Sequence, residues 1–225
     1  NDELTGGAGA DTFNVDAGTD SIADLSTGDI LLVSSGAKAN ATNVFAFVAT
    51  TSTNNQGEAN LYAAAGNATI DVSKSTSGGY NIFSGAGTDT LKGGTGNDII
   101  TIRNAGEANS DTIDGGAGND VLQLSSGAHT ITTDGKLTGI QTIKTDSAGS
   151  SADLSGQSEN LTMIGGDGVD VLKGGSGNDQ LTGGKSADTF NVAAGTDTVS
   201  DLQTTDILIV ATGATVNAGS IKEFV

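Results

Sequence analysis

The aspartates of this chain follow a nine-residue spacing. Thirteen of the 22 aspartates, called here the spaced aspartates, lie on it in three runs. They are Asp2, Asp11, Asp20 and Asp29; then Asp89, Asp98, Asp111 and Asp120, with a four-residue slip in the middle; then Asp170, Asp179, Asp188, Asp197 and Asp206. Carboxylates on a chain of net charge −18 attract cations and repel phosphates and anionic lipids. The spacing therefore indicates binding of hard metal ions through oxygen atoms.

Glycine-rich strings come before many of the spaced aspartates. The clearest is Gly93-Gly94-Thr95-Gly96-Asn97-Asp98, and corresponding strings lie at 115–120 and 174–179. Glycine adopts positive φ without steric cost, so such a string can reverse the chain and turn its carbonyl oxygens toward a common point. Calcium takes about 6–8 oxygen ligands at roughly 2.3–2.6 Å. Inward-facing carbonyls and an aspartate carboxylate would supply ligands of this type.

The unit Gly-Gly-x-Gly-x-Asp-x-apolar-x resembles the RTX (repeats-in-toxin) nonapeptide, a calcium-binding β-roll repeat. The best copies occupy 6–14, 93–101, 115–123, 165–173 and 174–182. Degraded copies occupy 15–23, 84–92, 106–114, 183–191 and 192–200. In the copy at 183–191, Lys185 and Ser186 replace a neutral residue and a glycine, so this copy departs most from the calcium-binding pattern.

The resemblance implies where calcium would bind. Each ion would lie between the turns of repeats that are two units apart: 165 with 183, 174 with 192, 84 with 106 and 93 with 115. About five or six calcium ions follow from this pairing. The implied aspartate ligands are Asp11, Asp20, Asp89, Asp98, Asp111, Asp120, Asp170, Asp179, Asp188 and Asp197. The implied turn ligands are Gly6, Gly9, Gly93, Thr95, Gly96, Asn97, Gly115, Ala117, Gly118, Asn119, Gly165, Asp167, Gly168, Gly174, Ser176, Gly177, Asn178 and Gly183.

An apolar residue stands two positions after every spaced aspartate. The set is Leu4, Phe13, Ile22, Leu31, Leu91, Ile100, Ile113, Leu122, Leu172, Leu181, Phe190, Val199 and Leu208. The residues around each are too few for a helix and suit a short strand that points the apolar side chain inward. The resemblance implies that two nonapeptides form one coil, with parallel strands in two facing sheets. We therefore expect an all-β fold, a right-handed parallel β-roll or β-solenoid with motif-poor coils between the motif runs.

Motif content divides the chain into six segments. RTX runs occupy 1–36, 84–123 and 165–210, and motif-poor segments occupy 37–83 and 124–164. Residues 211–225 begin a second copy of the 37–83 type, because 4–48 aligns without gaps to 181–225 with 27 identities in 45 positions. The chain starts inside a nonapeptide and ends inside this repeated block, so we expect it to be a segment of a longer protein.

The motif-poor segments keep part of the spacing. Leu61 and Ile70 are nine residues apart, as are Ile131 and Ile140. We interpret these segments as metal-free or metal-poor coils of the same solenoid, while 50–60 and 145–151 are equally consistent with loops. The best helix candidate is 58–65, with Gly66 as a stop.

The composition argues against other chemistry. The chain has no cysteine and one histidine, His129, which excludes disulfides, thiolate sites and a histidine-based metalloprotease. We expect His129 on the surface or in a strand. No nucleophile with a histidine partner can be assembled, and the spacing explains nearly all paired carboxylates, so we expect no catalytic residue and no enzyme. No apolar run reaches the length of a membrane span, so we expect no membrane insertion. The negative net charge repels phosphates, so we expect no nucleic-acid binding.

Hydrophobic burial is too small to order these glycine-rich, acidic runs, so we expect them to stay largely unfolded until calcium binds. The Thr/Ser/Ala/Gly bias, the duplication and the missing catalytic set favour a non-catalytic structural segment of a secreted bacterial cell-surface protein. It would resemble part of a surface-layer subunit or adhesin, and calcium could join copies in a lattice. The alternative is the accessory domain of an enzyme or toxin exported by type I secretion. Both hypotheses place the chain outside the cell. An ice-binding solenoid would need a flat threonine ladder, which the sequence lacks.

Overall fold

The computed structural model describes residues 1–219 of the chain, and in this range every regular element is a β-strand. The strands of the described residues pair in parallel, so the predicted parallel β-solenoid is confirmed. The chain forms two compact units. Unit 1 contains Asn1–Arg103 and Ser110–Val121, and unit 2 contains Asn104–Asn109 and the chain from Leu122 onward.

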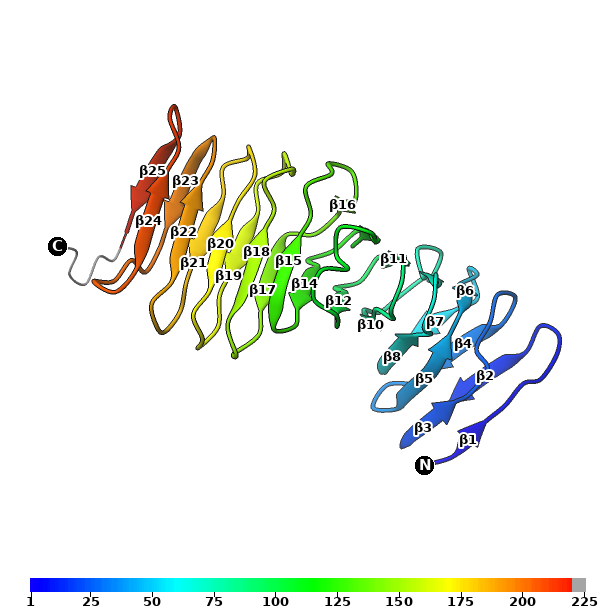
Figure 1. Ribbon diagram of the computed structural model, residues 1–225. Helices are drawn as coiled ribbons and strands as arrows, with labels where there is room; N and C mark the ends of the chain where they lie inside the picture. Colours follow the sequence, from blue (N-terminus) through cyan, green and yellow to red (C-terminus); the bar gives the residue numbers. More distant parts are fainter. Residues whose placement is uncertain (220–225) are drawn as a thin grey trace. The chain divides into compact units, whose positions relative to one another are not determined.

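Unit 1 contains three parallel sets of strands, seen at the blue-to-green end of Figure 1. The first set is β1 (Glu3–Leu4), β3 (Thr19–Ile22), β5 (Lys38–Val44), β8 (Glu58–Ala63), β10 (Tyr80–Phe83) and β12 (Ile99–Ile102). The second set is β2 (Thr12–Val15), β4 (Ile30–Val33) and β7 (Asn54–Asn55). The third set is β6 (Ala46–Val48), β9 (Thr69–Asp71), β11 (Thr90–Lys92) and β13 (Thr112–Asp114). The chain alternates between the first set and the other two, so each coil contributes strands to different sheets.

Unit 2 repeats this arrangement with two sets of five strands each. The first set is β17 (Thr142–Thr145), β19 (Thr162–Ile164), β21 (Gln180–Thr182), β23 (Thr196–Val199) and β25 (Thr215–Ala218). The second set is β15 (Gly127–Thr130), β18 (Ser150–Asp153), β20 (Val171–Lys173), β22 (Thr189–Val192) and β24 (Ile207–Val210). The remaining strands are β14 (Val121–Leu124) and β16 (Leu137–Thr138).

The strand register shows how long each coil is. In the outer motif runs one coil takes 18 residues, since Glu3 pairs with Ser21 and Val171 pairs with Thr189. In the middle run Thr90 pairs with Thr112, 22 residues later, because the four-residue slip is absorbed between β12 and β13. The motif-poor coils are longer and less regular. Lys38 pairs with Glu58, and Gly127 pairs with Ser150.

The core is a column of small apolar side chains between the sheets. Eleven of the thirteen apolar residues that follow the spaced aspartates are buried, as predicted. The exceptions are Leu4 and Leu208, which lie in β1 and β24 and are half-buried. Strands such as β2 and β22 alternate outward and inward side chains, which is the period of a strand with one buried face.

The motif-poor segments form coils of the same solenoid. The helix candidate at 58–65 is wrong, because Glu58–Ala63 is strand β8, paired on both sides with β5 and β10. The sequence left open whether 50–60 and 145–151 are loops. Strand β7 lies within 50–60, and strand β18 begins within 145–151. The duplication is also structural: Thr19 pairs with Lys38 in one copy and Thr196 pairs with Thr215 in the other. Positions 220–225 of the predicted second copy lie outside the described residues.

Candidate metal-binding turns

The spaced aspartates stand at the end of a turn, next to or inside the start of a strand. Eleven of them are buried: Asp20, Asp29, Asp89, Asp98, Asp111, Asp120, Asp170, Asp179, Asp188, Asp197 and Asp206. Asp2 and Asp11, in the first coil, are exposed and half-buried, respectively. Burying so many carboxylates is costly unless hydrogen bonds or cations compensate their charge.

One oxygen of each carboxylate connects neighbouring coils. The backbone N–H of a spaced aspartate donates to Oδ1 of the aspartate one coil later, so the aspartates of successive coils within a run form a ladder. The pairs are Asp2 with Asp20 (2.9 Å), Asp11 with Asp29 (2.9 Å), Asp89 with Asp111 (2.8 Å), Asp98 with Asp120 (2.7 Å), Asp170 with Asp188 (2.9 Å), Asp179 with Asp197 (3.0 Å) and Asp188 with Asp206 (3.0 Å). The structure thus brings together the turns whose pairing the resemblance implied.

The ladder of each later run begins on a motif-poor coil. Oδ1 of Asp89 and Asp98 accepts the N–H of Ala68 and Tyr80, at 2.8 and 2.6 Å. Oδ1 of Asp170 and Asp179 accepts the N–H of Ser150 and Leu161, at 2.8 and 2.9 Å. The coils that lack the motif therefore supply the first donors of the ladder.

The other oxygen belongs to the aspartate's own turn. In three of the best-conserved turns, Oδ2 accepts the N–H of the second glycine: Gly94 to Asp98 (2.7 Å), Gly166 to Asp170 (2.8 Å) and Gly175 to Asp179 (3.0 Å). Oδ2 of the same aspartate also lies close to the first glycine of the turn. A Cβ added to that glycine would lie less than 3 Å from this oxygen. This holds for Gly6, Gly93, Gly165, Gly174 and Gly183. The first glycine is therefore required by the close approach of the carboxylate.

Backbone carbonyls line up along the glycine turns. The carbonyl oxygen of Gly78 points at Gly96, and that of Gly96 points at Gly118. In unit 2 the carbonyl of Glu159 points at Gly177, and that of Gly177 points at Gly195. A Cβ at any of the receiving glycines would come within 3 Å of that carbonyl. Of the residues that carry these carbonyls, Gly96 and Gly177 are among the turn ligands predicted from the sequence, while Gly78 and Glu159 are not.

The remaining predicted turn residues lie at the outer side of the turns. Thr95, Asn97, Ala117, Gly118, Asn119, Asp167, Ser176, Asn178 and Gly9 are exposed, while Gly168 is half-buried and Gly115 is buried. The asparagines add a second ladder that the sequence did not predict. Oδ1 of Asn97 accepts the N–H of Asn119 (2.9 Å), and Oδ1 of Asn178 accepts that of Thr196 (2.8 Å).

The turn at 183–188, which departs most from the pattern, keeps its backbone shape. Ser186 takes the place of the third glycine at φ 79°, and its hydroxyl donates to the carbonyl of Asp167 at 2.7 Å. Lys185 forms an exposed ion pair with the Asp167 carboxylate at 2.9 Å. The ammonium group therefore turns toward the neighbouring coil and leaves Asp188 uncompensated.

The residues fit a hard cation. Oδ2 of Asp188 and of Asp197 is buried and has no hydrogen-bond partner. Burial, with the charge of neighbouring aspartates, raises the pKa of Asp98 and of Asp188 to about 6. Burial also raises the pKa of Asp120, Asp179 and Asp197. Within residues 1–219 no three acidic or histidine side chains converge as a metal cluster. An ion here would therefore take most of its ligands from carbonyls, as calcium can.

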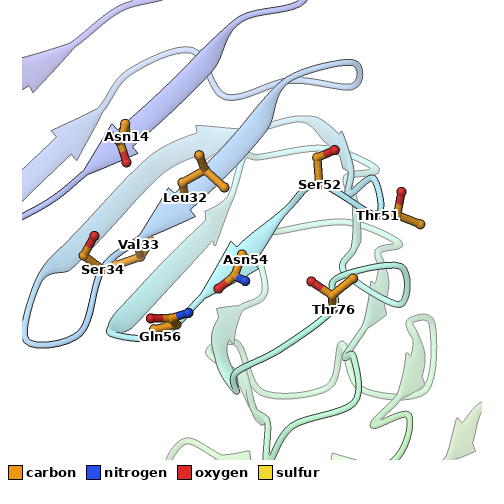
Figure 2. Close-up of a pocket in the computed structure, with 9 residues that line it drawn as sticks. All are labelled: Asn14, Leu32, Val33, Ser34, Thr51, Ser52, Asn54, Gln56 and Thr76. Carbon is orange, nitrogen blue, oxygen red and sulfur yellow. The ribbon is translucent and has the colours of Figure 1, made fainter.

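His129 lies in β15 and is buried, which agrees with the strand alternative. Its Nε2 is 2.9 Å from the carbonyl oxygen of Ser125, and burial lowers its pKa. Figure 2 shows a hollow beside β2, β4 and β7 whose lining consists of amide, hydroxyl and aliphatic side chains. The lining residues are Asn14, Leu32, Val33, Ser34, Thr51, Ser52, Asn54, Gln56 and Thr76, and none is a predicted metal ligand.

Replacing Gly175 by alanine is expected to lower stability by about 1–3 kcal/mol. Its Cβ would come within 3 Å of the Gln157 carbonyl, which belongs to the backbone of the preceding coil and cannot rotate away. Thermal unfolding in calcium measures the effect. Gly219→Ala is the matched control, because nothing lies within 4 Å of its Cβ. Equal melting temperatures for the two variants would contradict the close packing of the turns.

Replacing Asp179 by alanine is expected to cost about 2–5 kcal/mol in calcium. The change leaves the buried N–H groups of Leu161 and Gly175 without their acceptor and removes one of the predicted carboxylate ligands. Chemical denaturation measures the loss. Asp134→Ala is the control, since Asp134 is exposed and accepts a hydrogen bond from the Ser158 hydroxyl. A loss as small as that of the control would show that the ladder contributes little.

The fold and the turns together define a metal-binding β-solenoid. A family model for the RTX calcium-binding nonapeptide repeat matches the chain in four copies, at residues 1–22, 81–101, 105–133 and 164–199. No curated protein and no solved structure matches the chain. The chain carries RTX calcium-binding nonapeptide repeats along its length, and it is a calcium-binding repeat protein. No helix in residues 1–219 is long and apolar enough to cross a membrane.

Proposed function

We propose that this chain is a non-catalytic structural segment of a secreted bacterial cell-surface protein, of the surface-layer or adhesin kind. It would leave the cell unfolded, because the cytosol holds little free calcium, and fold on external calcium through the ligands predicted above. About five or six ions would bind, one between each pair of neighbouring turns.

The observation that carries this proposal is the continuity of the solenoid. The motif-poor coils continue the sheets of the motif runs in register, as in the pairing of Ile70 with Leu91. The block at 4–42 has its structural counterpart at 181–219, with the same pairing of β3 with β5 and of β23 with β25. A solenoid of repeated coils of this kind serves as a spacer or a lattice element. It requires no active site.

Calcium-dependent assembly tests the proposal. At about 1 mM calcium, the concentration range of extracellular calcium modules, the protein is expected to form sheets or filaments visible by electron microscopy. Light scattering during a calcium titration should rise over the range in which the β-structure forms. A folded protein that stays monomeric throughout the titration would contradict assembly, while leaving calcium-driven folding intact.

The alternative is an accessory domain of an enzyme or toxin exported by type I secretion. The observation that favours it is the run of uninterrupted 18-residue coils at 165–210, which needs no lattice partner to fold. The sequence that flanks this segment in its gene decides between the two. A catalytic domain beside it would support the accessory role, whereas further copies of the block at 4–48 would support the structural role.

A further inference from the structure

Asp24 and Asp201 occupy equivalent positions in the two copies of the duplicated block. Each stands where the repeat has its first glycine, in the turns 24–29 and 201–206, which read Asp-Leu-x-Thr-x-Asp. Leu25 and Leu202, in place of the second glycine, are buried. These turns lack the Gly-Gly opening, and each is the last turn of its motif run. Neither Asp24 nor Asp201 belongs to the ligands that the nonapeptide pattern implies.

Each of these carboxylates binds the Gly-Gly pair of the preceding coil. Asp24 accepts the N–H of Gly6 at 3.0 Å and of Gly7 at 2.8 Å. Asp201 accepts the N–H of Gly183 at 2.9 Å and of Gly184 at 2.8 Å. The Gly7 and Gly6 N–H groups hold the pKa of Asp24 below its ordinary value. The same two-point contact in both units shows that the duplicated sequence specifies it.

This contact changes the hydrogen bonding of the turn that it closes. In the turns 93–98, 165–170 and 174–179 the second glycine donates to Oδ2 of its own aspartate, as Gly175 does to Asp179. In the turn 183–188 the N–H of Gly184 donates to Asp201 instead. Oδ2 of Asp188 loses that donor, and it is buried without a hydrogen-bond partner. Asp188 itself is 0% exposed.

The two carboxylates meet at Gly183. Oδ1 of Asp201 accepts the Gly183 N–H, and Oδ2 of Asp188 lies within 3 Å of the place of a Gly183 Cβ. Gly6 has the same two neighbours, Asp24 and Asp11. Within residues 1–219 no ion pair joins a lysine or arginine to Asp188 or Asp201, and Lys185 is paired with Asp167. Two adjacent carboxylates with one open buried oxygen and no internal cation call for a bound cation.

We propose that Asp201 is a calcium ligand outside the nonapeptide pattern, which completes with Asp188 a site that ends the calcium ladder of the 165–210 run. Asp24 completes the equivalent site with Asp11 in the 1–36 run. A carboxylate oxygen that accepts one N–H keeps a lone pair for a metal ion. The carboxylate of Asp201 or Asp24 would thus supply the oxygen ligand and the negative charge in a turn that lacks the Gly-Gly opening. This inference rests on the proposed calcium binding.

The number of bound calcium ions tests the inference. Purified protein is dialysed against calcium, and the ions are counted by native mass spectrometry for wild type, D24N, D201N and the double variant D24N/D201N. Asparagine keeps one acceptor oxygen and the shape of the side chain but removes the charge. We expect each single variant to lose one ion and the double variant to lose two. D134N, which changes an exposed aspartate of unit 2, is expected to keep the wild-type count.

Each result has a distinct meaning. An unchanged count in folded D24N and D201N would overturn the inference and reduce both residues to acceptors of glycine N–H groups. A wild type that binds no calcium would overturn the proposed function itself. Circular dichroism in calcium reports whether each variant folds. If D201N does not fold, D24N in the other unit decides, and an unchanged count there overturns the inference.

Discussion

Removal of calcium with EDTA at pH 7.5 is expected to abolish most of the β-structure of this protein. Eleven aspartates are buried in stacked turns on a chain of net charge −18, which has 27 acidic side chains against nine lysines and arginines. Without cations these carboxylates repel one another along the ladder. Because the metal site exists only in the folded chain, the free energy of calcium binding becomes free energy of folding. Far-ultraviolet circular dichroism measures the loss, and added calcium should reverse it.

Magnesium is the informative control for this experiment. Magnesium requires near-octahedral geometry and keeps its water ligands, so it should not replace calcium among carbonyl ligands. At equal ionic strength, magnesium should leave the EDTA-treated protein unfolded. If magnesium or sodium chloride restored the β spectrum, general charge screening would explain the folding. A β spectrum that persists unchanged in EDTA would contradict metal-driven folding altogether.

The regular part of the fold could be predicted from the sequence because one motif fixes both the turn and the strand. The glycine turn has a fixed length, so the aspartate and the apolar residue two positions later recur at the same place in every coil. This is why Leu91 lies opposite Ile113, and Leu172 opposite Phe190. The four-residue slip did not disturb that register, since the extra residues fall outside the strands.

The motif-poor coils could be predicted only in outline. Without the glycine turn nothing in the sequence fixes the length of a coil, and the pairings of Lys38 with Glu58 and of Gly127 with Ser150 differ in spacing. The alanine-rich stretch 58–65 has a helical composition, yet Glu58–Ala63 pairs on both sides and buries most of its side chains. Sheet pairing with two neighbouring coils overrides a weak local propensity.

The candidate site was predictable as a set of residue types but not as a network. The sequence placed the aspartates and glycines of successive turns together, and the structure agrees. It did not reveal that the two oxygens of one carboxylate have different partners, as in Asp179, whose Oδ1 and Oδ2 bind different coils. It also missed Asp24 and Asp201, although the 177-residue duplication places them at equivalent positions. Calcium ligation by the individual residues stays a prediction.

In the absence of calcium, acidification from pH 7.5 to pH 5 is expected to increase the β-structure. Burial raises the pKa of Asp98 and of Asp188 to about 6, from a value of 3.8 for a solvated aspartate. The calcium-free folded chain therefore binds more protons than the unfolded chain between these two values. Its stability must rise as the pH falls through about 6, since protonation removes the cost of burying the charge. Circular dichroism in EDTA measures the increase.

The calcium-loaded protein should respond in the opposite direction. Calcium requires ionised carboxylates, so protons compete with the metal and acidification weakens calcium-dependent stability. The double variant D98N/D188N, which carries neutral side chains at both positions, should show a smaller pH response in EDTA than wild type. Measurements stop at pH 5 because the chain approaches its isoelectric point near 4.1, where loss of net charge promotes precipitation. A β signal of the calcium-free protein that falls on acidification would contradict the view that the burial of ionised aspartates opposes its folding.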